Sequence, residues 1–279
     1  MRYPAPRDRS EALGPTPDPT HQMINHPAKM RPPLIAIGAF LDYYAALRQR
    51  AGRTVFCFQV GANDGRSNDP VHRYFRDYAW RGLLIEPQRD VFEQGLARTY
   101  ADNPRVTLRN VALGTEDGSL PFYRVAISNE RWAHGLSSFV RSSLEEHIRS
   151  GYIARKAHEQ GLSLPDDPGR IIETVQVPTR TVSTLLKEHG IDFYDVLCID
   201  TEGYDFEILK LFDFERYRPD VVLFESNNLS EADFVAAHAL LRRFGYRLYW
   251  EKGDTLAVRI PYPLHRRLLH QAKGYLRRL

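Results

Sequence analysis

Phe56-Cys-Phe-Gln-Val-Gly-Ala-Asn-Asp-Gly65 and, downstream of it, Leu83-Leu-Ile-Glu-Pro87 decide the fold of this chain. Each begins as a short apolar run of the length and composition of a buried strand. The first run enters a glycine turn, and the second ends on the carboxylate of Glu86. A strand, a glycine loop, a helix and a second strand with a terminal acid form half of a nucleotide-binding unit.

The alternation of apolar strands with amphipathic helices continues along the chain. Helices are predicted over 34–50, 69–78, 90–101, 182–188, 206–211 and 230–244, and strands over 54–60, 82–85, 106–109, 195–199 and 221–224. A closing hairpin over 247–250 and 256–260 adds two more strands. Strands separated by helices form a parallel sheet covered on both faces. We therefore expect an α/β, Rossmann-like fold with a mostly parallel seven-stranded sheet, helices on both faces and an antiparallel strand at one edge.

The alternation is interrupted over 115–180, which we expect to be an insertion on the substrate side of a domain spanning 34–262. Within it we predict a strand over 118–126 pairing with 173–178, a loop over 132–139 and one helix over 142–160. Residues 1–33 hold eight of the 18 prolines and are expected to be a disordered or loosely attached tail. Residues 263–279 are expected to form a basic amphipathic C-terminal helix.

Composition excludes several classes of protein. The net charge of +3 is too small to favour nucleic acid as a partner. No run of 18 apolar residues and no signal-peptide pattern is present. Cys57 and Cys198 both lie in apolar runs and are expected to be buried free thiols. These features predict a soluble cytoplasmic protein.

The polar candidates share one position in the predicted sheet, the carboxyl ends of its strands. They are Gly61–Gly65, Glu86, Asn110, Asp200–Asp205 and Glu225. Open α/β sheets bind ligands at this edge, near the point where the strand order reverses. The sequence therefore predicts one ligand site built from several strand ends.

The residues of the glycine loop restrict the chemical class of the ligand. Gly61 and Gly65 flank Ala62, Asn63 and Asp64, whereas a dinucleotide fingerprint would have glycine at position 63, and no phosphate-binding Gly-Lys-Ser/Thr sequence exists. A polar loop of this kind suits an amino acid head group. Glu86 can accept hydrogen bonds from ribose hydroxyls, and Asn110 or the backbone of Val111-Ala112 can reach an adenine edge. Together these groups point to S-adenosylmethionine.

The chain resembles the FkbM-type S-adenosylmethionine-dependent methyltransferases. The segments that carry this resemblance span 54–260; they are Phe58–Gly65, Asn68–Pro70, Trp80–Pro87, Asn110–Leu113, Asp117-Gly118, Val177–Thr181, Ile199–Asp205, Phe224-Glu225 and Gly245-Tyr246. The resemblance implies a Rossmann-like class I methyltransferase fold and O-methylation of a hydroxyl, on a sugar, glycan or secondary metabolite. Two positions depart from the pattern: Gln59 replaces an acid common in the first motif, and Cys198 replaces a common lysine.

Candidate catalytic residues follow from the same edge. We expect Asp200 to position the cofactor or the acceptor, and Glu202 to orient the acceptor hydroxyl or remove its proton; alternatively Glu202 and Asp205 only cap the next helix. His134 is a candidate base, with Trp132 and Phe139 as an apolar or sugar-stacking wall, unless it is an exposed loop histidine.

Several alternatives stay open. Asp200, Glu225 and Asn227 offer oxygen ligands for Mg²⁺, unless Glu225 only binds loop amides. The chain is alternatively a catalytically silent S-adenosylmethionine- or nucleotide-binding module in an assembly, or an NAD-dependent oxidoreductase, which the absent middle glycine disfavours. The acceptor is expected to be a small molecule or glycan. The C-terminal helix packs on its own domain, forms a homodimer or makes peripheral contact with an anionic membrane.

Overall fold

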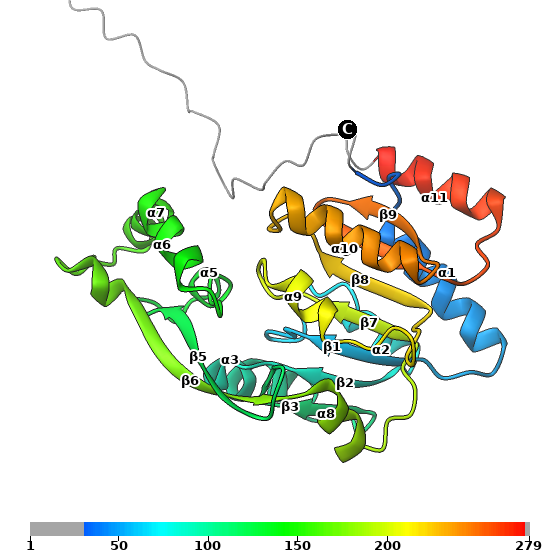
Figure 1. Ribbon diagram of the computed structural model, residues 1–279, viewed down its shortest axis with the longest axis horizontal. Helices are drawn as coiled ribbons and strands as arrows, with labels where there is room; N and C mark the ends of the chain where they lie inside the picture. Colours follow the sequence, from blue (N-terminus) through cyan, green and yellow to red (C-terminus); the bar gives the residue numbers. More distant parts are fainter. Residues whose placement is uncertain (1–30, 277–279) are drawn as a thin grey trace, which may run out of the picture.

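The computed structural model describes residues 31–276 of the chain, so most of the predicted N-terminal tail lies outside the described residues. A seven-stranded sheet forms its centre, and a smaller three-stranded sheet extends to one side (Figure 1). The large sheet has the order β3-β2-β1-β7-β8-β10-β9; its strands are β1 (Phe56–Val60), β2 (Arg81–Ile85), β3 (Val106–Arg109), β7 (Val196–Ile199), β8 (Val221–Glu225), β9 (Arg247–Glu251) and β10 (Asp254–Val258).

All neighbours in the large sheet pair in parallel except β10, which is antiparallel to both β8 and β9. The hairpin thus forms as predicted, and its antiparallel strand lies one place in from the edge strand β9. The order reverses between β1 and β7, because β2 and β3 extend to one side of β1 and the later strands to the other. This switch point is where a ligand is expected in an open α/β sheet.

Two apolar cores cover the two faces of the sheet, which explains why its strands are apolar on both sides. One core packs β1 and β7 against the first helices of the chain, α1 (Ile37–Arg50), α2 (His72–Asp77) and the continuous helix over Arg89–Thr99 with its central π-helical turn η1 (Phe92–Leu96). The other packs the sheet against α8 (Val182–Glu188), α9 (Asp205–Lys210) and α10 (Glu231–Arg243). Cys57 and Cys198 are buried free thiols, as expected, and burial raises the pKa of both.

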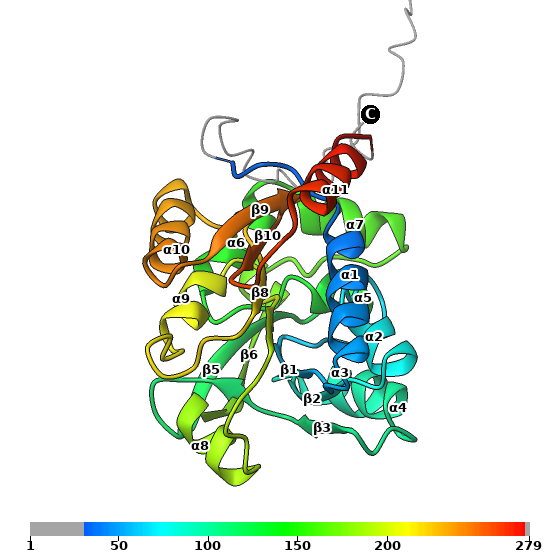
Figure 2. The same cartoon turned by 90° about the vertical axis from the view of Figure 1, so that its right-hand side faces the viewer.

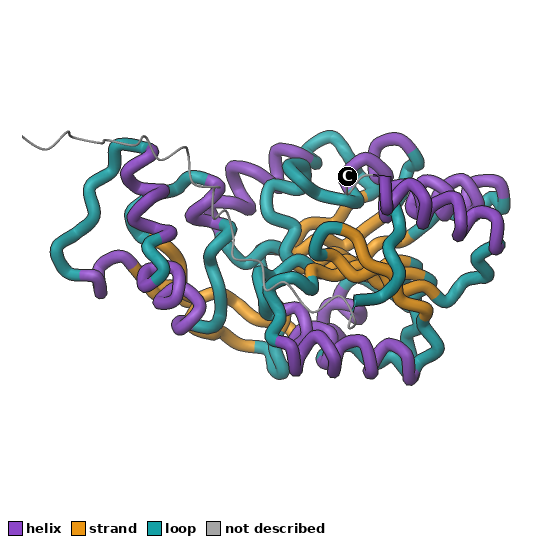
Figure 3. The backbone as a smooth tube through the Cα atoms, turned by 90° about the horizontal axis from the view of Figure 1, so that it is seen from above, coloured by secondary structure: helices purple, strands orange, loops and turns teal. Residues whose placement is uncertain are grey.

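The segment 115–180 forms a lobe beside the sheet, visible in Figure 1 and from above in Figure 3. Its strand β5 (Gly118–Val125) pairs antiparallel with β6 (Ile172–Arg180), as the sequence predicts, and β6 also pairs in parallel with β4 (Ala112–Leu113), which follows β3. The lobe contains its own small core of apolar side chains, led by Leu144 and Ile153.

Two predictions within the lobe are wrong. The single helix expected over 142–160 is two helices, α6 (Arg141–Arg149) and α7 (Tyr152–Glu159), because Gly151 between them has φ +73°, a left-handed value that ends a helix. The loop expected over 132–139 begins with a short helix, α5 (Arg131–His134). Ala133 is buried in the core of the lobe, and this packing favours the helical turn over an open loop.

The N-terminal helix is tied to the sheet by a buried charge network. The guanidinium of Arg48 on α1 contacts the carboxylates of Asp195 and Asp220, which precede β7 and β8. Asp195 also accepts a hydrogen bond from the backbone N–H of Phe56 at 2.8 Å, and Tyr44 donates to Asp220 at 2.9 Å. Arg48 thus neutralises two carboxylates at the amino ends of the strands, opposite the predicted ligand edge.

Replacement of Arg48 should leave these two carboxylates without a counter-charge. We expect Arg48→Met to lower the free energy of unfolding by about 3 kcal/mol. Urea denaturation followed by circular dichroism measures this change. Arg50→Met, at an exposed position of the same helix, is the control and should change the value by less than about 0.5 kcal/mol; equal effects of the two variants would contradict the assignment.

Candidate active site

A cavity lies at the carboxyl ends of β1, β2 and β7, at the switch point and below the lobe. Figure 1 shows these strands with β5 and β6 of the lobe to one side, and Figure 2 shows β1 and β2 from the side opposite the lobe. The cavity is lined from the large sheet by the loops after β1, β2, β3 and β7, and from the lobe by α5 and the segment after it. Its lining includes Gln59, Gly61, Ala62, Asn63, Asp69, Glu86, Gln88, Val111, Ala112, Arg131, His134, Phe139, Asp200 and Glu202. Nine of the predicted site residues are therefore brought together here.

Gly61 brings the loop after β1 into contact with the loop after β7 at the base of the cavity. It has φ +77°, and a Cβ at this position would lie 1.8 Å from the carbonyl oxygen of Asp200. The backbones after β1 and β7 therefore touch at the switch point, and only glycine permits this approach. The contact fixes the backbone of Asp200, whose side chain is exposed to the cavity.

Glu86 organises the neighbouring loop. Its Oε2 accepts a hydrogen bond from the backbone N–H of Asn63 at 2.9 Å, and its Oε1 accepts one from the N–H of Gln88 at 2.9 Å. Asn63 itself is left-handed, with φ +48°. Burial raises the pKa of Glu86 to about 7. A carboxylate oxygen can accept two hydrogen bonds, so Glu86 has acceptor capacity for a ligand hydroxyl beyond its contacts with Asn63 and Gln88.

Three predicted cofactor residues do not line the cavity. Asp64 caps its own loop by accepting from the N–H groups of Arg66 and Ser67. Gly65 faces away, where a Cβ would collide with Leu96 and Tyr100. Asn110 donates its side-chain amide to the carbonyl groups of Glu86 and Pro87, at 2.8 and 3.0 Å. These side chains support the loops, and the segment after Asn110 reaches the cavity through Val111 and Ala112.

Asp69 lines the cavity, although the sequence indicated it only as the start of a helix. Asp69 does bind the N–H groups of Val71 and His72 with Oδ1, at 2.7 and 3.1 Å. Its Oδ2 accepts from the side-chain amide of Gln59 at 3.1 Å. A carboxylate is thus present beside Gln59, the position where an acid is common, but it comes from another part of the chain. Burial raises the pKa of Asp69.

Two acids of the turn after β7, Glu202 and Asp205, have different roles. Asp205 accepts hydrogen bonds from the hydroxyl and N–H of Thr201 and from the N–H of Gly203, so it closes the turn before α9. The alternative that Glu202 and Asp205 cap this helix is wrong, because no side chain caps its N-terminus. Glu202 does not cap; it has φ +52°, lines the cavity and accepts from Asn228 Nδ2 at 3.2 Å. Desolvation and the nearby carboxylates of Asp200 and Asp205 raise the pKa of Glu202.

Acidic residues accumulate along the whole edge. Desolvation, aggravated by mutual repulsion, also raises the pKa of Asp205 to about 7 and that of Asp254 to about 8. Arg131 on α5 is the single arginine or lysine among the cavity-lining residues, and its guanidinium donates to the carbonyl oxygen of Ser67 at 2.7 Å. A cavity with four acids and one basic side chain in its lining favours a cationic ligand over a diphosphate.

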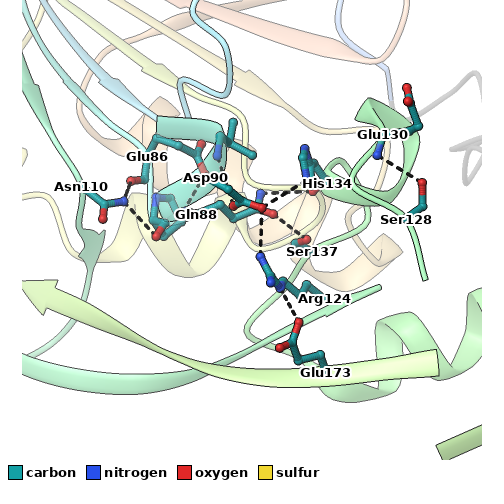
Figure 4. A network of polar contacts seen from close by, with 12 residues as sticks. Glu86, Gln88, Asp90, Asn110, Arg124, Ser128, Glu130, His134, Ser137 and Glu173 are labelled. Atoms are coloured by element: carbon teal, nitrogen blue, oxygen red, sulfur yellow. Dashed lines mark hydrogen bonds and ion pairs between the residues drawn. The ribbon is translucent and has the colours of Figure 1, made fainter. Parts of the chain in front are cut away.

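The lobe is fastened to the loop after β2 by a network of polar contacts (Figure 4). Gln88 donates to the backbone carbonyl of His134 at 3.2 Å and accepts from the hydroxyl of Ser137 at 2.9 Å. Arg124 on β5 bridges Asp90, at 3.1 Å, and Glu173. The network holds α5 over the cavity, and no sequence motif indicated it.

The predicted roles of the lobe residues diverge. His134 is half-buried and lines the cavity, its Nε2 lies 3.6 Å from Asp90 Oδ2, and burial lowers its pKa. Phe139 also lines the cavity, with its ring 5.7 Å from that of Tyr204. Trp132 does not; it donates to Gln160 and packs inside the lobe. The expected aromatic wall therefore contains Phe139 but not Trp132.

A second cavity adjoins the first beneath the helices of the lobe. The two share Gly135, Ser138 and Glu202, so Glu202 lies where they meet. The lining of the second cavity is rich in hydroxyl, amide and charged groups, and includes Ser142, Ser143, Glu146, His147, Ser150, Tyr152, Arg155 and Asn228.

The structure gives the alternative of a magnesium site no support. Within residues 31–276, no three His, Cys, Asp or Glu side chains converge closely enough to hold a metal ion. Glu225 accepts from the side-chain amide of Asn228 at 2.9 Å, and Asn227 is buried beside Gly253. The same part of the chain contains no helix with the length and apolar character needed to cross a bilayer.

Comparison with known proteins identifies the family. The family model described as the methyltransferase FkbM domain matches residues 59–248. The chain belongs to this family. The matched region of the FkbM domain holds both cavities and the whole lobe. The seven-stranded sheet, whose strand β10 lies beyond the matched region, is that of a Rossmann-like class I methyltransferase. No curated protein matches the chain.

Solved structures similar to this FkbM domain include three methyltransferases. An FkbM methyltransferase from Methylobacillus flagellatus has 14% identity and a TM-score of 0.43, with 74% of this chain and 43% of that one covered. The N-terminal domain of human METTL16 in complex with SAH has 10% identity and a TM-score of 0.39, covering 80% and 69%. A putative caffeoyl-CoA O-methyltransferase from Staphylococcus aureus has 8% identity and a TM-score of 0.40, covering 78% and 82%.

The contact between Gly61 and Asp200 can be tested in this FkbM domain by adding one methyl group. Gly61→Ala should lower the free energy of unfolding by at least about 3 kcal/mol, because the new Cβ meets a backbone oxygen. Gly52→Ala is a matched control, since Gly52 has φ +65° and no atom within 4 Å of its Cβ position; it should cost only about 1 kcal/mol. Thermal and urea denaturation measure both, and equal losses would contradict the close contact.

Proposed function

We propose that this protein is an S-adenosylmethionine-dependent O-methyltransferase that acts on a hydroxyl of a sugar, a glycan or a related polyhydroxylated metabolite. One observation carries the proposal: an acidic cavity at the switch point adjoins a second, hydroxyl-rich cavity, with Glu202 at their junction. Membership of the FkbM family supports methyl transfer, and the pair of cavities supports a cofactor and an acceptor bound side by side.

The residues of the first cavity fit the cofactor. S-adenosylmethionine supplies a methyl group on a positively charged sulfonium, together with an ammonium group, and the carboxylates of Asp69, Asp200 and Glu202 provide a negative environment for these charges. Glu86 has acceptor capacity for a ribose hydroxyl. The apolar positions Val111 and Ala112 suit an adenine ring. The absence of a basic cluster fits NAD less well, because a diphosphate would face these acids.

Glu202 is the base that the geometry favours. It lies between the two cavities, Asn228 orients its carboxylate, and its raised pKa suits a group that accepts a proton near neutral pH. With the cofactor bound, this carboxylate would hold the proton that the acceptor hydroxyl gives up. The cofactor would supply the activated methyl group, whose bond to sulfur breaks as the bond to the acceptor oxygen forms, leaving a neutral thioether. Asp200, whose backbone Gly61 fixes, positions the ligands. His134 is less favoured as a base because its Nε2 lies near Asp90.

The second cavity supports a polyhydroxylated acceptor. Its serine, histidine and asparagine side chains can both donate and accept hydrogen bonds. A binding module that only holds a nucleotide has no need of such an acceptor space. The family and the paired cavities therefore favour the enzyme over the silent module. A screen of labelled S-adenosylmethionine against sugars and glycan fractions tests this directly, and cofactor binding without transfer to any of them would favour the module.

Binding of the cofactor should depend on pH. At about pH 6 the buried acid Glu86, with a pKa of about 7, is largely protonated in the free protein. Ribose hydroxyls that donate to the Glu86 carboxylate and the positive charge of the ligand both favour the ionised form, so binding releases protons and strengthens as pH rises towards about pH 7.5. We expect the affinity for S-adenosylmethionine to increase about five- to ten-fold over this range.

Isothermal titration calorimetry at several pH values measures this increase. S-adenosylhomocysteine is the control ligand, since it lacks the sulfonium charge and should show a smaller dependence. An identical pH dependence for the two ligands would mean that the cavity acids do not respond to the sulfonium.

Replacement of the proposed base separates catalysis from binding. Glu202→Gln keeps the size of the side chain but removes its basicity, and we expect kcat to fall at least about 10²-fold while the Kd for S-adenosylmethionine changes less than about three-fold. Glu207→Gln, on the outer side of α9 in an exposed ion pair with Lys210, should retain activity. Methyl transfer to the best acceptor of the screen is the assay, and full activity of Glu202→Gln would exclude Glu202 as the base.

A further inference from the structure

The C-terminal helix α11 (Leu264–Leu276) is attached to the domain through its small and polar residues. His270 is buried, and its backbone carbonyl accepts from the N–H of Ala36 at 2.9 Å. A Cβ on Gly274 would lie 2.7 Å from the backbone of Ile35, so the helix touches the main chain at this point. Figure 2 shows α11 beside the start of α1 at one end of the molecule.

The opposite side of α11 is apolar and exposed. Its large apolar residues are between 46% and 71% exposed; they are Leu264, Leu268, Leu269, Tyr275 and Leu276. At 3.6 residues per turn these positions, together with Ala272 and the exposed His265, fall within an arc of about 140° that faces away from His270 and Gly274. A helix that belongs only to its own domain buries its apolar side. This helix presents that side to the outside.

Basic residues border the apolar arc. Helical spacing places Arg266 and Lys273 along one margin and Arg267 beyond the other. Residues 255–279 contain six arginines and lysines and no acid, whereas the rest of the chain has 32 basic against 35 acidic residues. The excess of positive charge therefore lies in this C-terminal stretch of the sequence, and three of its six cations are on α11.

We propose that α11 docks the domain on an anionic lipid surface, with its axis in the membrane plane. An apolar arc bordered by cations matches a bilayer boundary, because leucines enter the acyl region while lysine and arginine meet lipid phosphates. A second copy of this chain is a poorer occupant, since pairing two such helices would bring their cations together. The helix is also too short to span a bilayer and carries three described cations. This inference does not depend on the proposed function.

Vesicle co-sedimentation of the full chain tests the proposal. Vesicles of phosphatidylcholine mixed with phosphatidylserine should bind the protein, vesicles of phosphatidylcholine alone should bind much less, and salt should weaken the binding. The double variant Leu268→Gln/Leu276→Gln should reduce binding at least about ten-fold without a change in Tm, because both side chains are exposed.

The matched control is the double variant Phe193→Gln/Val235→Gln, which removes two apolar side chains that are 49% and 51% exposed elsewhere on the surface. It should bind vesicles like the unmodified chain. Three results would overturn the proposal: no binding to phosphatidylserine vesicles, an equal loss in the control variant, or a dimer in light scattering that the α11 variant abolishes while vesicle binding persists.

Discussion

The backbone at Gly61 lies against the carbonyl oxygen of Asp200, and the arrangement of the active site depends on this contact. The loops after β1 and β7 leave the sheet on opposite sides of the switch point, so their side chains would diverge if the backbones were held apart. A residue without a Cβ lets them meet. Beside this contact, Asp200 lines the first cavity and Glu202 lies where the first and second cavities meet. The backbone N–H of Asn63, in the loop after β1, donates to Glu86.

The second constraint is the accumulation of carboxylates at this edge with one guanidinium, that of Arg131, among the residues facing them. Burying several acids together destabilises their ionised forms, and the raised pKa values of Glu86, Glu202 and Asp205 express that cost. A fold retains such an arrangement where a cationic ligand offsets it. The lobe completes the enclosure, because Gln88 and Arg124 hold its helices against the loop after β2.

The large sheet was predicted well from the sequence because most of its strands are local apolar runs and its longer helices show apolar periodicity, with side-chain caps on α8 and α10. The glycine loop and Glu86 were recognisable for the same reason, since they follow strands directly. Asp69 and Gln88 were missed because their roles arise from contacts across the fold. The break at Gly151 was overlooked, because apolar periodicity continues through it and only the backbone conformation reveals it. Which side of α11 faces outward likewise depends on its docking against Ile35.

We expect the methyl donor in the cavity at the carboxyl ends of β1, β2 and β7. A crystal structure with bound S-adenosylmethionine shows its position directly. The ribose hydroxyls should lie within hydrogen-bond distance of Glu86, the adenine beside Val111 and Ala112, and the methyl group should face the junction at Glu202. A ligand found in another part of the molecule, or a cavity that stays empty at saturating ligand while S-adenosylmethionine still binds in solution, would contradict the assignment of this cavity as the cofactor site.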